Sequence, residues 1–170
     1  MLRRKSSWWL AVCAGLIVLG FIWQAFRPAA NAPALTYTTL SGSPLSTASL
    51  RGKVYLVNFW ATTCTTCVAE MPELVTTFNK YQPQGFELIA VAMQYDRPDY
   101  VVSFTQQRQL PFTVALDTQG QAAEAFGQVV MTPTTFLVDK EGRILKRYLG
   151  KPNFAELHGL IESALAAPHA

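Results

Sequence analysis

The sequence contains few residues that could bind a metal ion or build a disulfide-rich scaffold. Its 170 residues include only three cysteines and two histidines, Cys13, Cys64, Cys67, His158 and His169. A small disulfide scaffold carries more than about 8% cysteine, so that class is excluded. A structural zinc ion needs about four ligands, and both histidines lie in or beyond the last predicted helix. We therefore expect neither a metal nor a cofactor.

Acidic residues are absent before Glu70, and this makes the net charge of +3 misleading. Four of the fourteen basic residues precede position 28, so residues 28–170 carry ten basic and eleven acidic side chains, a net charge of −1. A domain with this balance has no basic stripe, and we expect no nucleic-acid partner. Because half of the residues are hydrophobic, a disordered chain is also excluded.

A long apolar run lies near the N-terminus. It extends from Trp8 to Trp23 and, with one glutamine, to Phe26. As a helix rising ~1.5 Å per residue, the longer segment spans about 28 Å, close to the thickness of a hydrocarbon core. Tryptophans at both ends favour the membrane interfaces, and the basic residues before the run favour a cytoplasmic N-terminus. The sequence predicts an uncleaved anchor over residues 1–27, a linker over 28–34 and an exported domain over 35–170.

Two alternatives for this leader also export the domain. A signal peptide could be cleaved after small residues, and residues 30–32 (Ala-Asn-Ala) would serve. Lipidation at Cys13 is disfavoured because bulky Val12 precedes it and a long apolar stretch follows it. Cys13 is more simply explained as a small hydrophobic side chain within the membrane.

The remaining sequence alternates between strand and helix patterns. Residues 54–60 are β-branched, aromatic and apolar, as in a central strand covered on both faces. Apolar residues at helical spacing follow from Cys67 to about Lys80. Further strands are expected at 86–93, 112–116, 134–138 and 144–148, with an edge strand within 34–40, and helices at 98–108, 121–126 and from about Asn153. This order predicts one α/β domain with a mixed central sheet flanked by helices.

Cys64 and Cys67 lie where the central strand passes into a helix. Three residues of helix place the two Cα atoms about 5 to 5.5 Å apart, within the range that a disulfide requires. Cys64 lies at the positive end of the helix dipole, which favours its thiolate, whereas Cys67 lies one turn deeper. We expect Cys64 to attack a substrate disulfide and Cys67 to resolve the mixed disulfide. Half of a zinc site and an inert structural pair are the weaker alternatives.

Glu70 lies one turn after Cys67 on the same helical face. A buried carboxyl there could take the proton of Cys67 during resolution. An exposed carboxylate that favours the helix N-terminus explains the same residue equally well. Pro133 opens a predicted strand, and its local sequence does not predict a cis peptide bond.

These motifs together resemble the membrane-anchored TlpA/ResA family of thioredoxin-like oxidoreductases. The resemblance covers about residues 35–165 and is carried by residues 60–72 (Trp-Ala-Thr-Thr-Cys-Thr-Thr-Cys-Val-Ala-Glu-Met-Pro), by residues 52–54 and by residues 132–139. It implies a thioredoxin-like fold in the bacterial periplasm or on the outer face of the cell membrane. It also implies that Cys64 is the nucleophile, Cys67 the resolving thiol and Glu70 the nearby acid.

The resemblance further implies that Pro133 is a cis-proline facing the disulfide, and that Thr132, Pro133 and Trp60 contact the substrate. The expected substrates are protein disulfides, such as those of apocytochrome c, and the expected electron donor is a membrane protein. Thr63, Thr65, Thr66 and Val68 depart from the usual family residues, so the redox potential and the substrate do not follow from the resemblance.

Two other functions share this fold and stay open as alternatives. A peroxiredoxin-type peroxidase needs Thr or Ser three residues before its reactive cysteine, where this chain has Ala61. A copper-delivery (Sco-like) module uses three residues between its cysteines and a distal histidine, whereas this chain has two residues and no well-placed histidine.

Overall fold

A computed structural model of the chain describes residue 13 and residues 30–168. Within that part, no helix has both the length and the apolar composition needed to span a membrane. The predicted anchor over residues 1–27 lies outside the described residues, apart from Cys13.

The described domain is built on one mixed sheet of seven strands in the order β2-β1-β5-β4-β3-β6-β7. Strands β3, β4 and β5 are parallel, and the other neighbouring pairs are antiparallel. The strands are β1 (Thr36–Thr39), β2 (Pro44–Ser46), β3 (Val54–Trp60), β4 (Phe86–Ala92), β5 (Thr113–Leu116), β6 (Thr134–Val138) and β7 (Ile144–Leu149).

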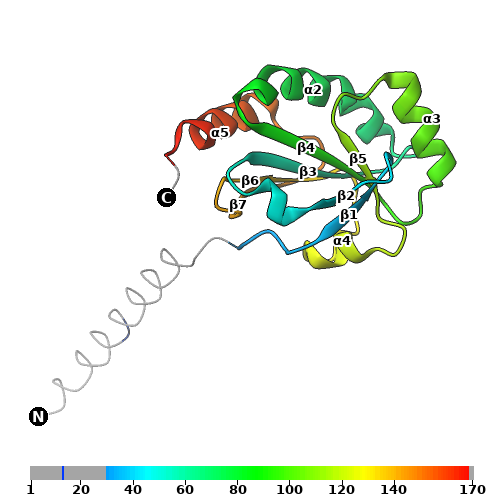
Figure 1. Cartoon of the computed structure of the whole chain (residues 1–170), viewed down its shortest axis with the longest axis horizontal. Coiled ribbons are helices and arrows are strands. Elements are labelled where there is room, and N and C mark those ends of the chain that lie inside the picture. Colours follow the sequence, from blue (N-terminus) through cyan, green and yellow to red (C-terminus); the bar gives the residue numbers. More distant parts are fainter. Residues whose placement is uncertain (1–12, 14–29, 169–170) are drawn as a thin grey trace, which may run out of the picture.

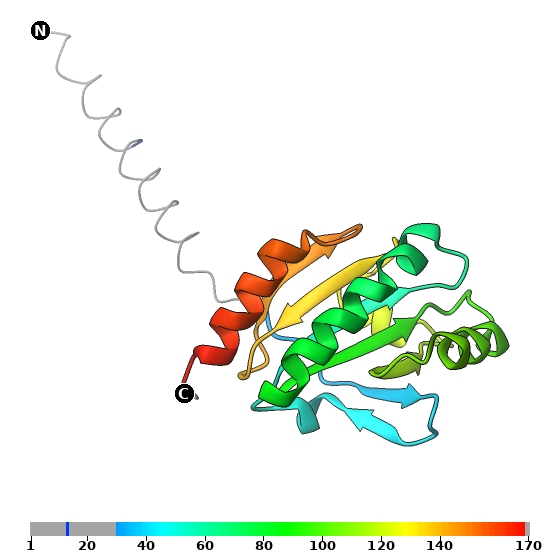
Figure 2. The same ribbon diagram turned by 90° about the horizontal axis from the view of Figure 1, so that it is seen from above.

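Helices cover both faces of this sheet (Figures 1 and 2). On one face lie α2 (Thr65–Tyr81), α3 (Pro98–Arg108) and α5 (Phe154–Ala166), whose side chains share one hydrophobic core. The short helix α4 (Gln121–Ala125) packs on the other face within a second core. Two 3-10 turns, η1 (Thr47–Leu50) and η2 (Gln82–Gln84), complete the fold.

Strand β3 lies in the interior of the sheet between β4 and β6, and all seven of its residues are buried. Leu56 and Trp60 belong to the core beneath α2, whereas Val57 and Phe59 belong to the core beside α4. This alternation follows from the period of two in a strand and explains why its sequence is apolar almost throughout. The prediction of a central strand at 54–60, and of a mixed sheet flanked by helices, is confirmed.

Strands β4 and β7 and helix α4 end one residue away from their predicted ends, and three further details differ from the sequence-based prediction. Helix α2 begins at Thr65 rather than at Cys67, because the Cys64 side chain caps it by accepting from the amide of Cys67. Strand β2 was not expected, since three residues that begin with proline give no alternation, and it pairs only with β1. Phe112 lies just outside β5, which begins at Thr113.

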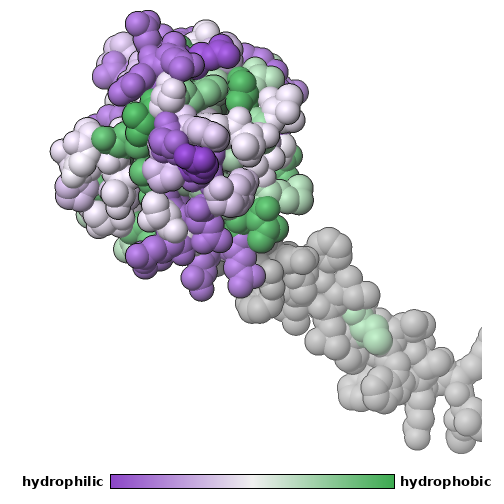
Figure 3. Space-filling view, turned by 90° about the vertical axis from the view of Figure 1, so that its right-hand side faces the viewer, coloured by the Kyte–Doolittle hydropathy of each residue, from purple (hydrophilic) through white to green (hydrophobic). Residues whose placement is uncertain are grey.

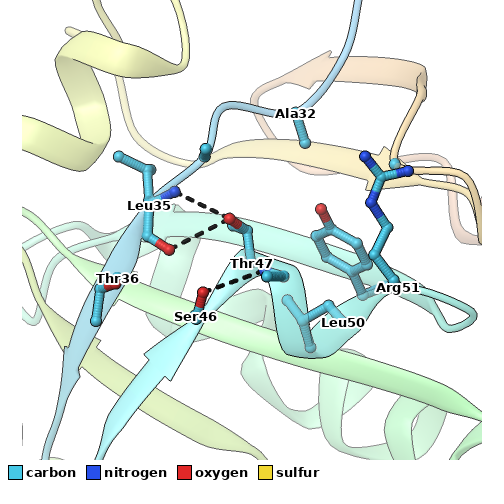
Figure 4. A pocket seen from close by; sticks show the side chains of 11 residues that line it. Ala32, Leu35, Thr36, Ser46, Thr47, Leu50 and Arg51 are labelled. Carbon is cyan, nitrogen blue, oxygen red and sulfur yellow. Dashed lines mark hydrogen bonds between the residues drawn. The ribbon is translucent and has the colours of Figure 1, made fainter.

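The segment before β1 is bound to the domain by hydrogen bonds. The Ala32 amide donates to the Gly142 carbonyl, and the Ile144 amide donates to the Ala30 carbonyl, each at 2.8 Å. Farther along, the Leu35 amide and the Thr47 hydroxyl are hydrogen-bonded at 2.9 Å beside a pocket (Figure 4). Residues 30–32 therefore extend the edge of the sheet beside the start of β7.

This attachment lies at the opposite end of the sheet from the two cysteines. Tyr55, at the start of β3, pairs with Val138, so the turn from Asp139 to Arg143 lies beyond that end of β3. Cys64 follows the other end, and the seven residues of β3 span about 20 Å.

Candidate active site

The two cysteines form a disulfide at the N-terminus of α2. Their Cα atoms are 5.2 Å apart, within the predicted range. The Cys64 sulfur also accepts a hydrogen bond from the Cys67 amide at 3.2 Å. Because unpaired amides at a helix N-terminus favour negative charge, this position stabilises a thiolate on Cys64 once the disulfide is reduced.

The two sulfurs differ in their access to solvent. Cys67 is fully buried in the core beneath α2, whereas Cys64 is only partly buried, and its neighbours Thr63 and Thr65 are exposed. A protein disulfide can therefore approach Cys64 first, with Cys67 behind it.

Glu70 lies one turn beyond Cys67 and is wholly buried. The Asn58 amide on β3 donates a hydrogen bond to its Oε1 at 3.0 Å, while its Oε2 has no hydrogen-bond partner among the described residues. Burial raises the pKa of Glu70 to about 7, partly opposed by the Asn58 hydrogen bond and the positive charge of Lys151. Of the two interpretations of this residue, its position matches the buried carboxyl and not the exposed helix-end acid.

Thr132 and Pro133 lie in the loop before β6. Their peptide bond is cis, which the local sequence did not predict and the resemblance implied. Pro133 is buried and Thr132 is partly exposed. Within the part of the chain that the structure describes, neither the backbone N–H nor the carbonyl of Thr132 has a hydrogen-bond partner, so both are free to pair with an extended peptide.

Trp60 does not lie where substrate contact would require. Its side chain is wholly buried under the helices, and its ring centroid is 5.2 Å from that of Phe104 on α3. Because β3 is covered by α2 and α3 on this face, Trp60 supports the site from beneath. The prediction that Trp60 contacts the substrate is corrected accordingly.

Exposed apolar residues surround the cis-proline loop. Val130 is 81% exposed, Met131 is 59% exposed, and Tyr95 is 57% exposed, with its hydroxyl 3.3 Å from that of Thr132. Figure 3 views the molecule from the α3 side of Figure 1, and apolar surface lies there among polar groups. Phe59 pairs with Thr134, so this loop lies at the end of the sheet that leads to the cysteines. Large exposed apolar side chains are typical of a surface that binds other proteins.

Sequence reasoning missed three contributors to the site. Asn58 holds Glu70, Asp96 accepts two hydrogen bonds from Thr62 before the cysteines, and Tyr95 meets the cis-proline loop. Asn58 could have been noticed as a polar residue within an apolar strand, since buried polar groups need partners. The other two depend on loops that come together only in the folded chain.

This arrangement can exchange disulfides. One sulfur is accessible and placed for ionisation, a second is buried within bonding distance, and a carboxyl of raised pKa lies one turn behind. A thiolate that attacks a disulfide and a second thiol that resolves the product are the two requirements of thiol–disulfide exchange.

Known proteins with similar sequences and folds carry this chemistry. The Redoxin family model matches residues 27–161. The chain is 35% identical over 128 residues to the thiol-disulfide oxidoreductase ResA of Bacillus thuringiensis subsp. konkukian (strain 97-27), covering 75% of this chain and 72% of that relative.

Two solved structures show the same fold. A thiol:disulfide interchange protein of the thioredoxin family from Chlorobium tepidum TLS superposes with a TM-score of 0.74 and 28% identity, over 82% of this chain and 98% of that one. The solution structure of a candidate thioredoxin from Neisseria meningitidis gives a TM-score of 0.74 and 41% identity, over 78% and 88% of the two chains. The chain therefore belongs to the redoxin family and is a ResA-type thiol-disulfide oxidoreductase with Cys64 and Cys67 as its redox pair.

Proposed function

We propose that this oxidoreductase reduces protein disulfides outside the cytoplasm while anchored in the bacterial inner membrane. Residues 1–27 would be the anchor, residues 28–34 the linker and residues 35–170 the catalytic domain in the periplasm or on the outer face of the cell membrane. The apolar run and the basic residues before it support this location. Residues 30–32 bind at the end of the sheet far from the cysteines, which supports an orientation in which the disulfide would face away from the membrane.

The unequal access of the two sulfurs is the observation that carries this proposal. In the reduced enzyme the Cys64 thiolate attacks a substrate disulfide, and one substrate sulfur leaves as a thiolate. Cys67 then loses its proton to Glu70 and attacks the Cys64 sulfur. The mixed disulfide breaks, the second substrate sulfur leaves, and two electrons have passed from the enzyme to the substrate.

The cis-proline loop would bind the substrate. An extended peptide can pair with the free backbone of Thr132 beside Pro133, while its apolar side chains cover Met131, Val130 and Tyr95. Backbone pairing tolerates many sequences, so this mode suits unfolded protein segments. Apocytochrome c is one such substrate.

The two residues between the cysteines support a reducing rather than an oxidising role. Thr65 and Thr66 bring no histidine charge to stabilise the thiolate, so the reduced form is not strongly favoured and the enzyme gives up its electrons readily. An oxidising compartment would then require a membrane protein that supplies electrons to the disulfide.

The test is insulin reduction by the full chain with three variants. Cys64→Ser should abolish activity, and Cys67→Ser should accumulate a mixed disulfide at Cys64 that dithiothreitol releases. Cys13→Ser is the matched control and should retain full activity. Activity that survives Cys64→Ser would overturn the assignment of the nucleophile.

The direction is tested by the midpoint potential of the Cys64–Cys67 pair in glutathione buffers. A potential at or below about −220 mV would support a reductant, and one near −120 mV, typical of a strong oxidant, would contradict it.

A further inference from the structure

A buried amide connects the acid of the active site to the strand that follows the cis-proline. Asn58 is wholly buried on β3, and its Nδ2 donates to Glu70 Oε1 at 3.0 Å and to Thr135 Oγ1 at 2.9 Å. Because a side-chain amide has two N–H donors, both are used. The Glu70 carboxyl is therefore fixed to the sheet through one of its two oxygens.

The fold makes this contact specific. Asn58 and Thr135 are directly opposite in the antiparallel pair of β3 and β6. On β3, the side chain of Asn58 lies on the same face as those of Leu56 and Trp60, which pack beneath α2. Glu70 approaches this face from α2, one turn after Cys67. Asn58 thus joins three elements, and it does so without belonging to the cysteine motif.

The second carboxyl oxygen of Glu70 accepts no hydrogen bond from the described residues. Glu70 Oε2 and Asn58 Oδ1 are both buried, and neither has a hydrogen-bond partner among the described residues. Buried polar atoms are nearly always paired, so a carboxyl oxygen without a protein partner one turn from Cys67 is an acceptor that stays open to a proton. A proton is such a partner for Oε2.

We infer that Asn58 is a positioning residue: it holds Glu70 through Oε1 so that Oε2 is the atom that accepts the proton of Cys67 during resolution. This inference rests on the proposed role of Glu70. In the step, the Cys67 S–H bond breaks and an O–H bond forms on Oε2, while Cys67 bonds to Cys64 and the substrate leaves as a thiolate. The proton then passes from Glu70 to the departing thiolate or to solvent, and atoms and charge balance.

The Asn58 contact also determines when Glu70 is ionised. Its N–H stabilises the carboxylate form and so lowers the pKa of Glu70, against the larger effect of burial. Two charged groups act from outside, with Lys151 lowering this pKa and Glu73 raising it, and these two form an exposed ion pair with each other. Loss of the Asn58 amide should leave Glu70 protonated, and unable to accept a proton, up to a higher pH.

The test separates the attack of Cys64 from resolution by Cys67. Reduced Cys13→Ser enzyme, whose only thiols are Cys64 and Cys67, is mixed with dithiobis-nitrobenzoate. The first coloured thiolate is released by Cys64, and the second is released when Cys67 resolves the mixed disulfide. Both phases are followed against pH in this background for the parent chain, Asn58→Leu, Glu70→Gln and the double variant. In Asn58→Leu the second phase should slow about tenfold near pH 6 and recover at high pH, a shift of its inflection by about one pH unit.

The double variant distinguishes positioning from general damage. It should be no slower in the second phase than Glu70→Gln alone, because Asn58 acts only through Glu70. Additive losses, or an unshifted inflection in Asn58→Leu, would overturn the inference about Asn58. An unchanged profile in Glu70→Gln would instead overturn the proposed role of Glu70.

A direct titration of the Glu70 carboxyl tests the inference without enzyme turnover and without relying on Asn58→Leu alone. The infrared carbonyl band of the protonated Glu70 carboxyl, assigned by its loss in Glu70→Gln, is followed against pH in the oxidised protein. Asn58→Ala, which keeps the backbone pairing if Asn58→Leu does not fold, should move this titration up by about one pH unit. Thr77→Val removes a different buried polar group, on α2, and controls for destabilisation. It should leave the titration of Glu70 unchanged. Equal titrations in the parent and Asn58→Ala would refute the inference.

Discussion

The carboxylate of Asp96 receives two hydrogen bonds from Thr62, one from its backbone amide and one from its hydroxyl, each at 2.6 Å. Thr62 lies in the turn between β3 and the cysteines, and Asp96 lies in the loop after β4. Asp96 is only 7% exposed, so water does not replace these bonds readily. This contact fixes the turn that leads from β3 to Cys64 against the loop that follows β4.

Removing the Asp96 carboxylate should destabilise the domain. Asp96→Ala leaves the partly buried amide and hydroxyl of Thr62 without their partner, and we expect a loss of about 1 to 3 kcal/mol in the free energy of unfolding, measured with urea. Asp99→Ala is the matched control, because its ion pair with Arg97 is exposed, and it should change stability by less than about 0.5 kcal/mol. Equal losses in the two variants would contradict a structural role for the Asp96 contact.

Glu70 should make stability depend on pH in the opposite sense to an ordinary surface carboxylate. Burial raises its pKa from 4.5 to about 7, so the folded state holds this proton more tightly than the unfolded chain. Its contribution to stability is therefore fully present below about pH 4.5 and is lost as the pH rises through about 7.

Glu70→Gln removes this dependence. Relative to the parent, the variant should gain roughly 3 kcal/mol in the free energy of unfolding between about pH 4.5 and about pH 8. Urea unfolding of the oxidised parent and variant at these two pH values measures the difference. If the free energies of unfolding of the parent and Glu70→Gln differ by the same amount at both pH values, Glu70 has an ordinary pKa.

The apolar residues beside the cis-proline loop should matter for proteins and not for small disulfides. In Met131→Ser the KM for insulin should rise about three- to tenfold, because apolar contact area is lost, whereas the rate with dithiobis-nitrobenzoate should stay the same. Leu145→Ser is a suitable control, since Leu145 is 41% exposed on β7, at the end of the strand away from the cysteines. If Met131→Ser slows the reactions with insulin and with dithiobis-nitrobenzoate equally, the loop acts on the chemical step and not on protein binding.

The proposed orientation on the membrane can be measured by energy transfer. Single labels are attached at Tyr95→Cys and at Glu141→Cys in oxidised Cys13→Ser protein held in nanodiscs with acceptor lipids. Because residues 30–32 bind beside Gly142 and Tyr95 lies beyond the other end of the parallel strands, the label at position 141 should be quenched more strongly. Stronger quenching at position 95 would contradict the orientation, and a chain that does not enter nanodiscs would contradict the anchor itself.

The sequence by itself determined the elements that depend on local pattern. The apolar run of β3 and the helical spacing after it predicted a strand that feeds a helix, and the two-residue gap between Cys64 and Cys67 placed their Cα atoms at disulfide distance. These predictions held because strand and helix periodicity, and the rise of one helical turn, are set by the backbone alone.

Only the tertiary structure decided which side chains surround the disulfide. The sequence left Glu70 equally suited to burial and exposure, and the family resemblance made Trp60 a substrate contact. Asn58 stood out only as a polar residue in an apolar strand, and nothing in the sequence linked it or Asp96 to the site. Each of these depends on which loops and faces come together across the sheet, and the spacing between residues along a chain does not specify such long-range contacts. The fold buries Glu70 and Trp60 beside Asn58 because α2 covers that face of β3, and it brings Asp96 to Thr62 because β3 and β4 end side by side.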